Sequence, residues 1–255
     1  QRGHGGRSKN GDFTYNLAGN FMFAKNKVIF MDETPQPEGY EYLYLTGHPM
    51  GSSLYYQCIG INRTEEDLKN YPQMAGSGLG DYIYKDIDEN GKIDAKDMLR
   101  SDLNTIPQIV FGLTANFQYK NFDLSILFQG QALARLHYTP LQAPLEGNIT
   151  KEMATQSWNL DRPDAKYGRI NSTNNRKEST MWLRNAAFLR LKNVELGYNF
   201  SGKALKTVGV KGLRLYIGGY NLFTISGLKE VDPETNNTAA YPLMRVFNTG
   251  VKVTF

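Results

Sequence analysis

The sequence predicts an all-β protein that forms part of the wall of an antiparallel transmembrane β-barrel. Three observations lead to this fold class: apolar and polar residues alternate with a period of two, the alternating stretches are long, and short turns alternate with long connections. A period of two indicates strands with two different faces. Stretches of about 10–14 residues exceed the ~5–6 residues of ordinary strands and match the ~9–11 of strands that cross a membrane.

The expected strands differ in the strength of their signal. In residues 13–23 the odd positions are mostly aromatic or aliphatic, and the even positions are Thr, Asn and Ala with one Met. Residues 111–119 and 122–132 alternate in the same way, and the intervening Lys120-Asn121 predicts a tight hairpin turn. The full set of expected strands, roughly seven, covers residues 13–23, 54–61 (the weakest), 111–119, 122–132, 193–200, 213–217 and 247–255. The opening residues, QRGHGGRSKNG, predict a solvated loop.

The connections between these strands are unequal in length. Long connections cover about residues 62–104, 137–185 and 226–243, whereas the turn at Lys120-Asn121 has two residues. Outer-membrane barrels show this asymmetry, with short periplasmic turns and long extracellular loops. Aromatic residues also gather at the strand ends, as expected for interfacial girdles: they are Tyr119, Phe122, Tyr198, Phe200 and Phe255. A soluble β-sandwich with one wet face is the alternative, and the long loops count against it.

Composition excludes several classes of protein. Hydrophobic residues make up 40% of the 255 residues, which excludes bulk disorder, and no apolar run approaches the ~18 residues of a membrane-spanning helix. The net charge of +4 gives no reason to expect a nucleic-acid partner. Cys58 is the single cysteine, and the three histidines lie far apart without a metal or catalytic motif. The sequence therefore predicts that the chain is not an enzyme.

Both ends of the sequence give rise to expectations. The chain has no initiator Met and no visible targeting segment, so we expect either that processing removed one or that the chain begins inside a larger protein. It stops on an alternating strand whose last residue is Phe255. A terminal aromatic residue of this kind resembles the C-terminal sorting signal of bacterial outer-membrane proteins.

Several stretches, taken in order, resemble the C-terminal region of the SusC/RagA family of TonB-dependent outer-membrane transporters. The resemblance extends from about residue 11 to the end of the chain. The stretches that carry it are YKDIDENGKIDAKD (84–97), TIPQIVF (105–111), FLRLKNVELGYNF (188–200), LRLYIGGYNLFTI (213–225), VDPE (231–234) and VKVTF (251–255). Each motif is weak alone, and their order and spacing make the resemblance specific.

The resemblance implies a barrel of about 22 strands in the whole protein, with a plug in its lumen. It also implies nutrient import across the outer membrane of a Gram-negative bacterium, driven through TonB and assisted by a SusD-like surface lipoprotein. Oligosaccharides or peptides would be the cargo. Residues 1–255 would then form the C-terminal part of the barrel, about seven strands, without the plug. The remaining barrel and plug polypeptide and the outer-membrane lipid would be its partners.

One stretch has the pattern of a calcium-binding loop. Residues 86–97 match D-x-D-x-N-G-x-I-x-x-x-D, in which oxygen-bearing residues recur at every second position. The expected ligands of a structural Ca²⁺ are Asp86, Asp88, Asn90, the backbone carbonyl of Lys92, Asp94 through water, and Asp97. Position twelve is Asp97 where EF-hands place Glu, and residues 78–84 do not read as a helix, so a paired EF-hand is not expected. An acidic turn without metal is the alternative.

Three aromatic residues in the longest expected loop are weak candidates for substrate contact. Trp158, Tyr167 and Trp182 carry rings that could stack on sugar faces, although such residues more often pack a loop against itself. The main alternative for the whole chain is a secreted calcium-binding β-sandwich with carbohydrate affinity. A small complete barrel acting as an adhesin or anchor is the second.

Overall fold

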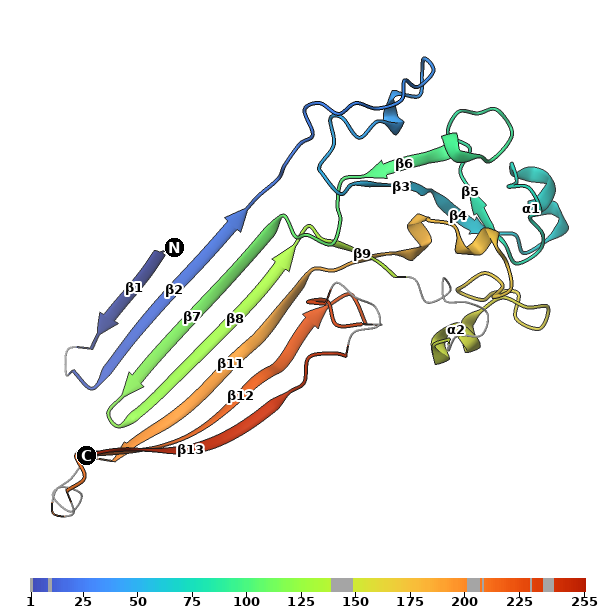
Figure 1. The fold of residues 1–255 in the computed structure, drawn as a ribbon. Helices are drawn as coiled ribbons and strands as arrows, with labels where there is room; N and C mark the ends of the chain where they lie inside the picture. The colour runs from blue at the N-terminus through green and yellow to red at the C-terminus, as the bar shows by residue number, and fades with distance from the viewer. Residues whose placement is uncertain are drawn as a thin grey trace. The chain divides into compact units, whose positions relative to one another are not determined.

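We describe the protein from a computed structural model, which covers residues 2–8, 11–138, 149–200, 207, 209–229, 231–235 and 241–255. The chain divides into two compact units (Figure 1). Unit 1 comprises Gln1–Ala24, Ile106–Ala134 and Asn185–Phe255, and unit 2 comprises Lys25–Thr105 and Arg135–Arg184. Within the described ranges, no helix has both the length and the apolar character needed to span a membrane.

Unit 1 is built on one seven-stranded antiparallel sheet (Figure 1). Its strands, in spatial order, are β1 (Arg2–Arg7), β2 (Phe13–Phe23), β7 (Ile109–Tyr119), β8 (Phe122–Ala132), β11 (Phe188–Phe200), β12 (Gly212–Ser226) and β13 (Val246–Thr254). The structure confirms the expected fold class, since the sheet is antiparallel and its five longest strands have 11 to 15 residues.

The register gives the sheet one apolar and one polar face. Because side chains alternate along a strand, residues that pair across successive strands lie on the same face. One such row is apolar and reads Leu17, Ala115, Ile126, Val194, Gly219 and Phe247. The adjacent row is polar and reads Asn16, Asn116, Ser125, Glu195, Gly218 and Asn248. A slip of one residue in any strand would exchange its two faces, so the pattern fixes the register.

The two ends of the sheet differ. The tight turn predicted at Lys120-Asn121 is confirmed: it joins β7 and β8, and Lys120 has a positive φ of 51°. At the other end Phe23 pairs with Ile109, which pairs with Ala132. The long connections at residues 24–108, 133–187 and 227–245 therefore all leave the sheet from the end opposite the tight turn.

Two strand predictions are wrong. The opening residues, expected to be a solvated loop, contain β1, which pairs along its whole length with β2. Residues 54–61, expected as a strand of the barrel wall, instead form β3 (Ser53–Tyr56) and β4 (Cys58–Ile61) in unit 2. β1 forms through backbone hydrogen bonds with β2 and has no apolar side chains that would reveal it in the sequence. β3 pairs with β6 and β4 with β5, partners that no local pattern specifies.

Unit 2 consists of short elements around an aromatic core. β3 pairs with β6 (Met98–Ser101), β4 with β5 (Tyr82–Tyr84), and β9 (Arg135–His137) with β10 (Leu183–Asn185). Its helices are α1 (Glu65–Asn70), α2 (Lys151–Gln156) and the 3-10 turns η1 (Glu41–Leu43), η2 (Ala95–Asp97), η3 (Asn174–Arg176) and η4 (Thr180–Trp182). The core contains Tyr56, Tyr82, Tyr84, Ile93, Met153, Tyr167 and Trp182.

Polar contacts inside unit 2 hold these short elements together. The carboxylate of Asp81 is fully buried and accepts two 2.7 Å hydrogen bonds from the guanidinium of Arg169. The side chain of Asn175, also fully buried, accepts from the Tyr82 backbone N–H and donates to two carbonyls. Buried polar groups that are satisfied in this way rigidify a fold. Unit 2 therefore offers a fixed frame for the acidic loop at residues 86–97.

Candidate functional site

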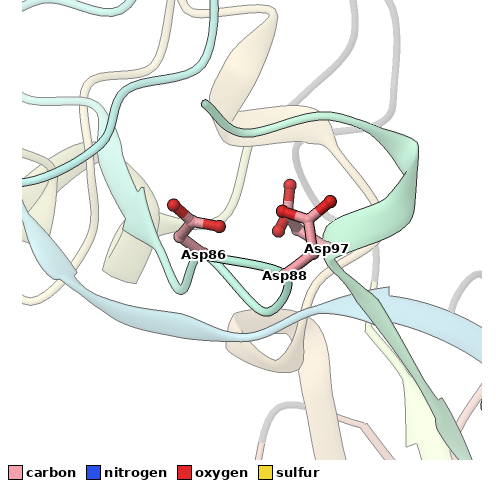
Figure 2. Close-up of side chains that lie close together, drawn as sticks. All are labelled: Asp86, Asp88 and Asp97. Carbon is pink, nitrogen blue, oxygen red and sulfur yellow. The ribbon is translucent and has the colours of Figure 1, made fainter. Parts of the chain in front are cut away.

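Three carboxylates of the acidic loop converge in the structure. Oxygen atoms of Asp86, Asp88 and Asp97 all lie within 4.8 Å of one another, and the three side chains gather around one small space (Figure 2). Asp97 belongs to η2 and is fully buried, whereas Asp86 and Asp88 are half-buried. This is the arrangement of hard oxygen ligands that Ca²⁺ favours.

Backbone N–H groups shape the loop around these carboxylates. Asp86 accepts from the Gly91 N–H at 2.7 Å, and Asp97 accepts from the N–H groups of Ile87 and Asp94 at 2.7 and 2.8 Å. Gly91 has a φ of 80°, a left-handed conformation that glycine adopts without strain. Gly91 therefore permits the sharp turn of the loop.

The other expected ligands have different contacts. The Asn90 side chain donates from Nδ2 to Asp88 and accepts the Lys92 N–H, so its oxygen already has a backbone partner. Asp94 caps η2 by accepting from the Lys96 N–H at 2.8 Å. The structure thus brings together Asp86, Asp88 and Asp97, and it uses Asn90 and Asp94 to shape the loop.

Two tyrosines that the sequence analysis did not identify, Tyr40 and Tyr42, hold this loop through hydrogen bonds. The Tyr40 hydroxyl donates to Asp88 at 2.8 Å, and the Tyr42 hydroxyl donates to the Lys96 carbonyl at 2.5 Å. The hydrogen bond from Tyr40 holds the pKa of the Asp88 carboxyl below its ordinary value. The ammonium of Lys96 also lies 4.5 Å from the centre of the Tyr40 ring. No sequence signal links residue 40 to residue 88, because this contact depends on the tertiary fold.

Arg100 anchors the same segment. Its guanidinium donates to the carbonyls of Leu43, Tyr44 and Ser52 at 2.6 to 2.9 Å. Because Leu43 and Tyr44 directly follow the two tyrosines, Arg100 fixes the backbone that presents them to the acidic loop.

The candidate substrate rings are mostly packed inside unit 2. Tyr167 and Trp182 are at most 1% exposed and stack on each other, with ring centres 6.2 Å apart and planes inclined by 5°. Buried rings cannot present a face to a sugar, so the expected substrate contact is corrected to core packing for these two residues. Trp158 is half-buried, with its ring against Gly80.

A shallow depression in unit 2 has a cavity volume of about 620 Å³ and borders Cys58, Arg63, Tyr82 and Lys166. Burial raises the pKa of the Cys58 thiol to about 11, so this thiol is protonated at neutral pH. A protonated thiol is a poor nucleophile. This depression therefore does not supply an activated cysteine.

The polar face of the unit 1 sheet carries two charged clusters. Near the tight turn, Arg214 contacts Asp123 and donates to Glu195 at 2.7 Å. Toward the other end, Arg190 is 2% exposed and donates to Thr224, Asp232 and Glu234 at 2.6 to 2.9 Å.

The second cluster gives the VDPE motif a structural role, because Asp232 and Glu234 hold the connection after β12 against the sheet. Charged residues at the polar positions of β8, β11 and β12 are visible in the sequence. Which of these charged residues pair with one another can be told only from the register of the strands.

The chain was compared with known proteins. No family model matches it. It is 27% identical over 281 residues to the TonB-dependent receptor P3 of Formosa agariphila, covering 96% of this chain and 27% of that protein. It is 28% identical over 265 residues to the TonB-dependent receptor SusC of Bacteroides thetaiotaomicron, covering 96% of this chain and 25% of SusC. The chain therefore spans about a quarter of the length of the curated relatives it matches.

Solved structures share the fold. The RagAB peptide transporter matches with a TM-score of 0.73 at 19% identity, over 97% of this chain and 28% of that chain. The RagAB peptide importer in an open state matches with a TM-score of 0.71 at 18% identity, over 99% and 28% of the two chains. In sequence the chain is similar to TonB-dependent receptors, SusC among them, and in fold it is similar to the RagAB transporter.

Proposed function

We propose that the chain forms part of the barrel wall of an outer-membrane nutrient importer that works with the TonB system. The observation that carries this proposal is the two-faced sheet of unit 1. Its apolar side chains are exposed, with Ile217 and Val251 each 61% exposed, while its other face bears Asn, Ser and paired charges. Contact with lipid accounts for the apolar face, and contact with a polar lumen accounts for the other face. The proposed role of the chain is transport and not catalysis.

The cargo class is bulky nutrient, either oligosaccharide or peptide, and a SusD-like surface lipoprotein is the proposed partner. Similarity to RagAB, which is described as a peptide transporter, supports peptide as the cargo, and oligosaccharide is the alternative implied by the resemblance of the sequence to the SusC/RagA family. The rest of the barrel and the plug would come from polypeptide beyond this chain, since the relatives are about four times longer.

We further propose that the loop at residues 86–97 binds one structural Ca²⁺. The convergence of Asp86, Asp88 and Asp97 supports this site. Three carboxylates so close together repel one another unless a cation compensates them. The ion would stiffen the loop of unit 2 and would not contact cargo.

A secreted calcium-binding β-sandwich is the competing function, because the acidic loop would suit it equally well. A sandwich requires a second sheet packed on the apolar face of the first. In the described part of unit 1, large apolar side chains on that face, such as Leu113 and Ile217, stay exposed. This observation favours the barrel wall.

The test uses the full-length protein in its native bacterium. We expect it to fractionate with the outer membrane, to need detergent for extraction, and to show heat-modifiable gel mobility. Uptake of its cargo should stop when TonB is deleted. Release into the medium without detergent would favour the secreted module, and uptake unaffected by TonB deletion would contradict the importer.

A further inference from the structure

An elongated depression runs along the strands on the apolar face of the unit 1 sheet. Its larger part has a volume of about 580 Å³ and is lined by Leu124, Val194, Leu196, Ile217, Leu222 and Phe247. A second part of about 300 Å³ adjoins it, and the two share Leu196, Ile217 and Thr249. The second part extends toward Phe122 and Tyr198, near the tight turn between β7 and β8.

At Gly219 the side chain of Leu222 packs over the backbone and forms part of the groove wall. In the apolar row across the sheet, Gly219 lies between Val194 and Phe247. A Cβ atom at Gly219 would come within 2.7 Å of the Leu222 side chain, so Leu222 lies close over the bare backbone. Gly219 does not have a positive φ, hence the backbone conformation does not require glycine here. The absence of a side chain at position 219 makes room for Leu222, which lines the groove.

The lining offers little to a polar ligand. The Thr249 hydroxyl donates to the Tyr216 carbonyl at 3.1 Å, so its hydrogen is already used. Asn248, which also borders the larger part, pairs with Gly218 and therefore belongs to the polar face. An occupant must be apolar along its whole length in the groove.

The dimensions suit a single linear chain. From Leu215 to Gly219 a strand advances about 14 Å, at ~3.4 Å per residue. Each carbon–carbon bond of about 1.5 Å advances an extended zigzag chain by about 1.3 Å, so roughly ten methylene groups would lie along this distance. The groove follows the strands, which cross the membrane in the proposed barrel, and acyl chains run in the same general direction.

We propose that this groove is a binding site for one acyl chain of a membrane phospholipid. The proposal rests on the proposed function, because it requires the apolar face to lie in a bilayer. Ile217, Leu215 and Val251 line the groove and are 42% to 61% exposed. The groove therefore opens onto that lipid-facing surface.

The ends of the groove decide which leaflet supplies the lipid. The Phe122 and Tyr198 rings are in edge contact with centres 4.7 Å apart, at the groove end nearest the tight turn. Aromatic rings of this kind mark the headgroup level, and short turns of outer-membrane barrels lie on the periplasmic side. The exposed side chains of Lys120 and Lys211 lie at the same end of the sheet and suit an anionic phosphate. The bound lipid therefore belongs to the periplasmic leaflet.

The experiment uses the full-length transporter reconstituted in vesicles of phosphatidylethanolamine and phosphatidylglycerol. A small fraction of the lipid carries a diazirine on one acyl chain, and cross-linked peptides are quantified by mass spectrometry. We expect labelling of residues 213–223 and 247–251 to exceed that of residues 111–117, on the same apolar face, at least fivefold.

Two variants that fill the groove give independent tests. A Leu at position 219 would push the Leu222 side chain into the groove, so Gly219→Leu and Thr249→Leu should each reduce labelling of the groove to the level of residues 111–117. Gly19→Leu is the matched control, since Gly19 lies on the same face in β2 and a Cβ there meets nothing closer than 3.8 Å. Labelling of the groove should be unchanged in this control.

Uniform labelling over the apolar face, or labelling that the two filling variants do not reduce, would overturn the acyl-chain site and leave the membrane placement intact. Cross-linking of the groove to another polypeptide would also overturn it. A complete lack of lipid labelling on the apolar face would contradict the proposed function itself, so the two failures are distinguishable.

Discussion

At the scale of single residues, the acidic loop shows how neighbouring carboxylates acquire different roles. Asp97 is fully buried and satisfied by two backbone N–H groups, Asp94 caps a 3-10 turn, and Asp88 is held by the Tyr40 hydroxyl. Each of these contacts costs side-chain entropy and favours one loop conformation. These contacts favour the loop conformation in which the carboxylates of Asp86, Asp88 and Asp97 converge.

The first prediction concerns Asp88. Replacing it with Ala removes a carboxylate from the cluster and the partner of Tyr40. In calcium, the loop of Asp88→Ala should be cut several times faster by protease than the wild-type loop, because Ca²⁺ can no longer close it. Limited proteolysis of intact outer membranes measures this rate.

Glu89→Ala is the control for Asp88→Ala. Glu89 is the adjacent acidic residue and is not one of the three converging carboxylates. Its variant should behave as wild type. A wild-type loop whose cleavage is the same with calcium and with chelator would contradict the metal site.

The second prediction concerns the pH dependence of the Asp102–His48 contact. The hydrogen bond with His48 Nδ1, 2.6 Å long, and the nearby Lys25 lower the pKa of the Asp102 carboxyl. A carboxyl whose pKa is lowered on folding adds stability above its unfolded pKa of about 3.9. That stability is lost as the pH falls through the lowered value.

Asp102→Asn should therefore make residues 25–48 more susceptible to protease at pH 7, and the difference from wild type should shrink as the pH falls below about 3.9. The pair is partly exposed, at 33% and 40%, so the effect corresponds to about 1 kcal/mol or less. Cleavage by an enzyme active at pH 7 and at pH 3 measures it. A difference between variant and wild type that persists unchanged at pH 3 would contradict this role.

At the scale of elements, the sequence predicted the strands whose side chains alternate and missed what depends on partners. β2, β7, β8 and β11 are visible because one face is apolar and the other polar. β1 has no such signal: three of its six residues are glycine, and its pairing with β2 rests on backbone hydrogen bonds. The three converging aspartates follow a local pattern, whereas the Tyr40 contact links residues 48 positions apart and leaves no trace in the sequence.

The third prediction concerns the two faces of β8. Ile126 lies between Ala115 and Val194 on the apolar face, and Ser125 lies between Asn116 and Glu195 on the polar face. An Arg at the bilayer midplane costs about 2–4 kcal/mol. Ile126→Arg should therefore impair assembly of the full-length barrel. Ser125→Arg, beside Glu195, should assemble nearly as well as wild type.

The yield of heat-modifiable protein in the outer membrane measures assembly of these two variants. Equal yields would mean that the two faces do not differ in their surroundings. That result would remove the basis for assigning lipid to one of them.

At the scale of the whole molecule, the sheet of unit 1 has two open edges in the described residues. β1 and β13 each pair with one neighbour. An unpaired backbone group in lipid costs several kcal/mol, so an open sheet is not stable in a membrane. The relatives are about four times longer than this chain, which is consistent with further strands that cover both edges.

The fourth prediction follows from these edges. Residues 1–255 expressed alone should aggregate and should not form a heat-resistant barrel. Detergent refolding followed by size-exclusion chromatography and gel mobility measures this. A stable, monomeric and protease-resistant barrel obtained from this chain alone would show that the edges can pair with each other.

The central claim is that unit 1 is a barrel wall with lipid on its apolar face, and site-specific lipid quenching tests it most directly. In a full-length protein with Cys58 and any other native cysteine replaced by Ser, single cysteines at 124 to 129 of β8 would carry a fluorophore, and the bilayer would contain a lipid-borne quencher. We expect strong quenching at Leu124, Ile126 and Phe128 and weak quenching at Ser125, Leu127 and Gln129. Quenching that does not alternate, or that is absent from all six positions, would contradict the barrel wall.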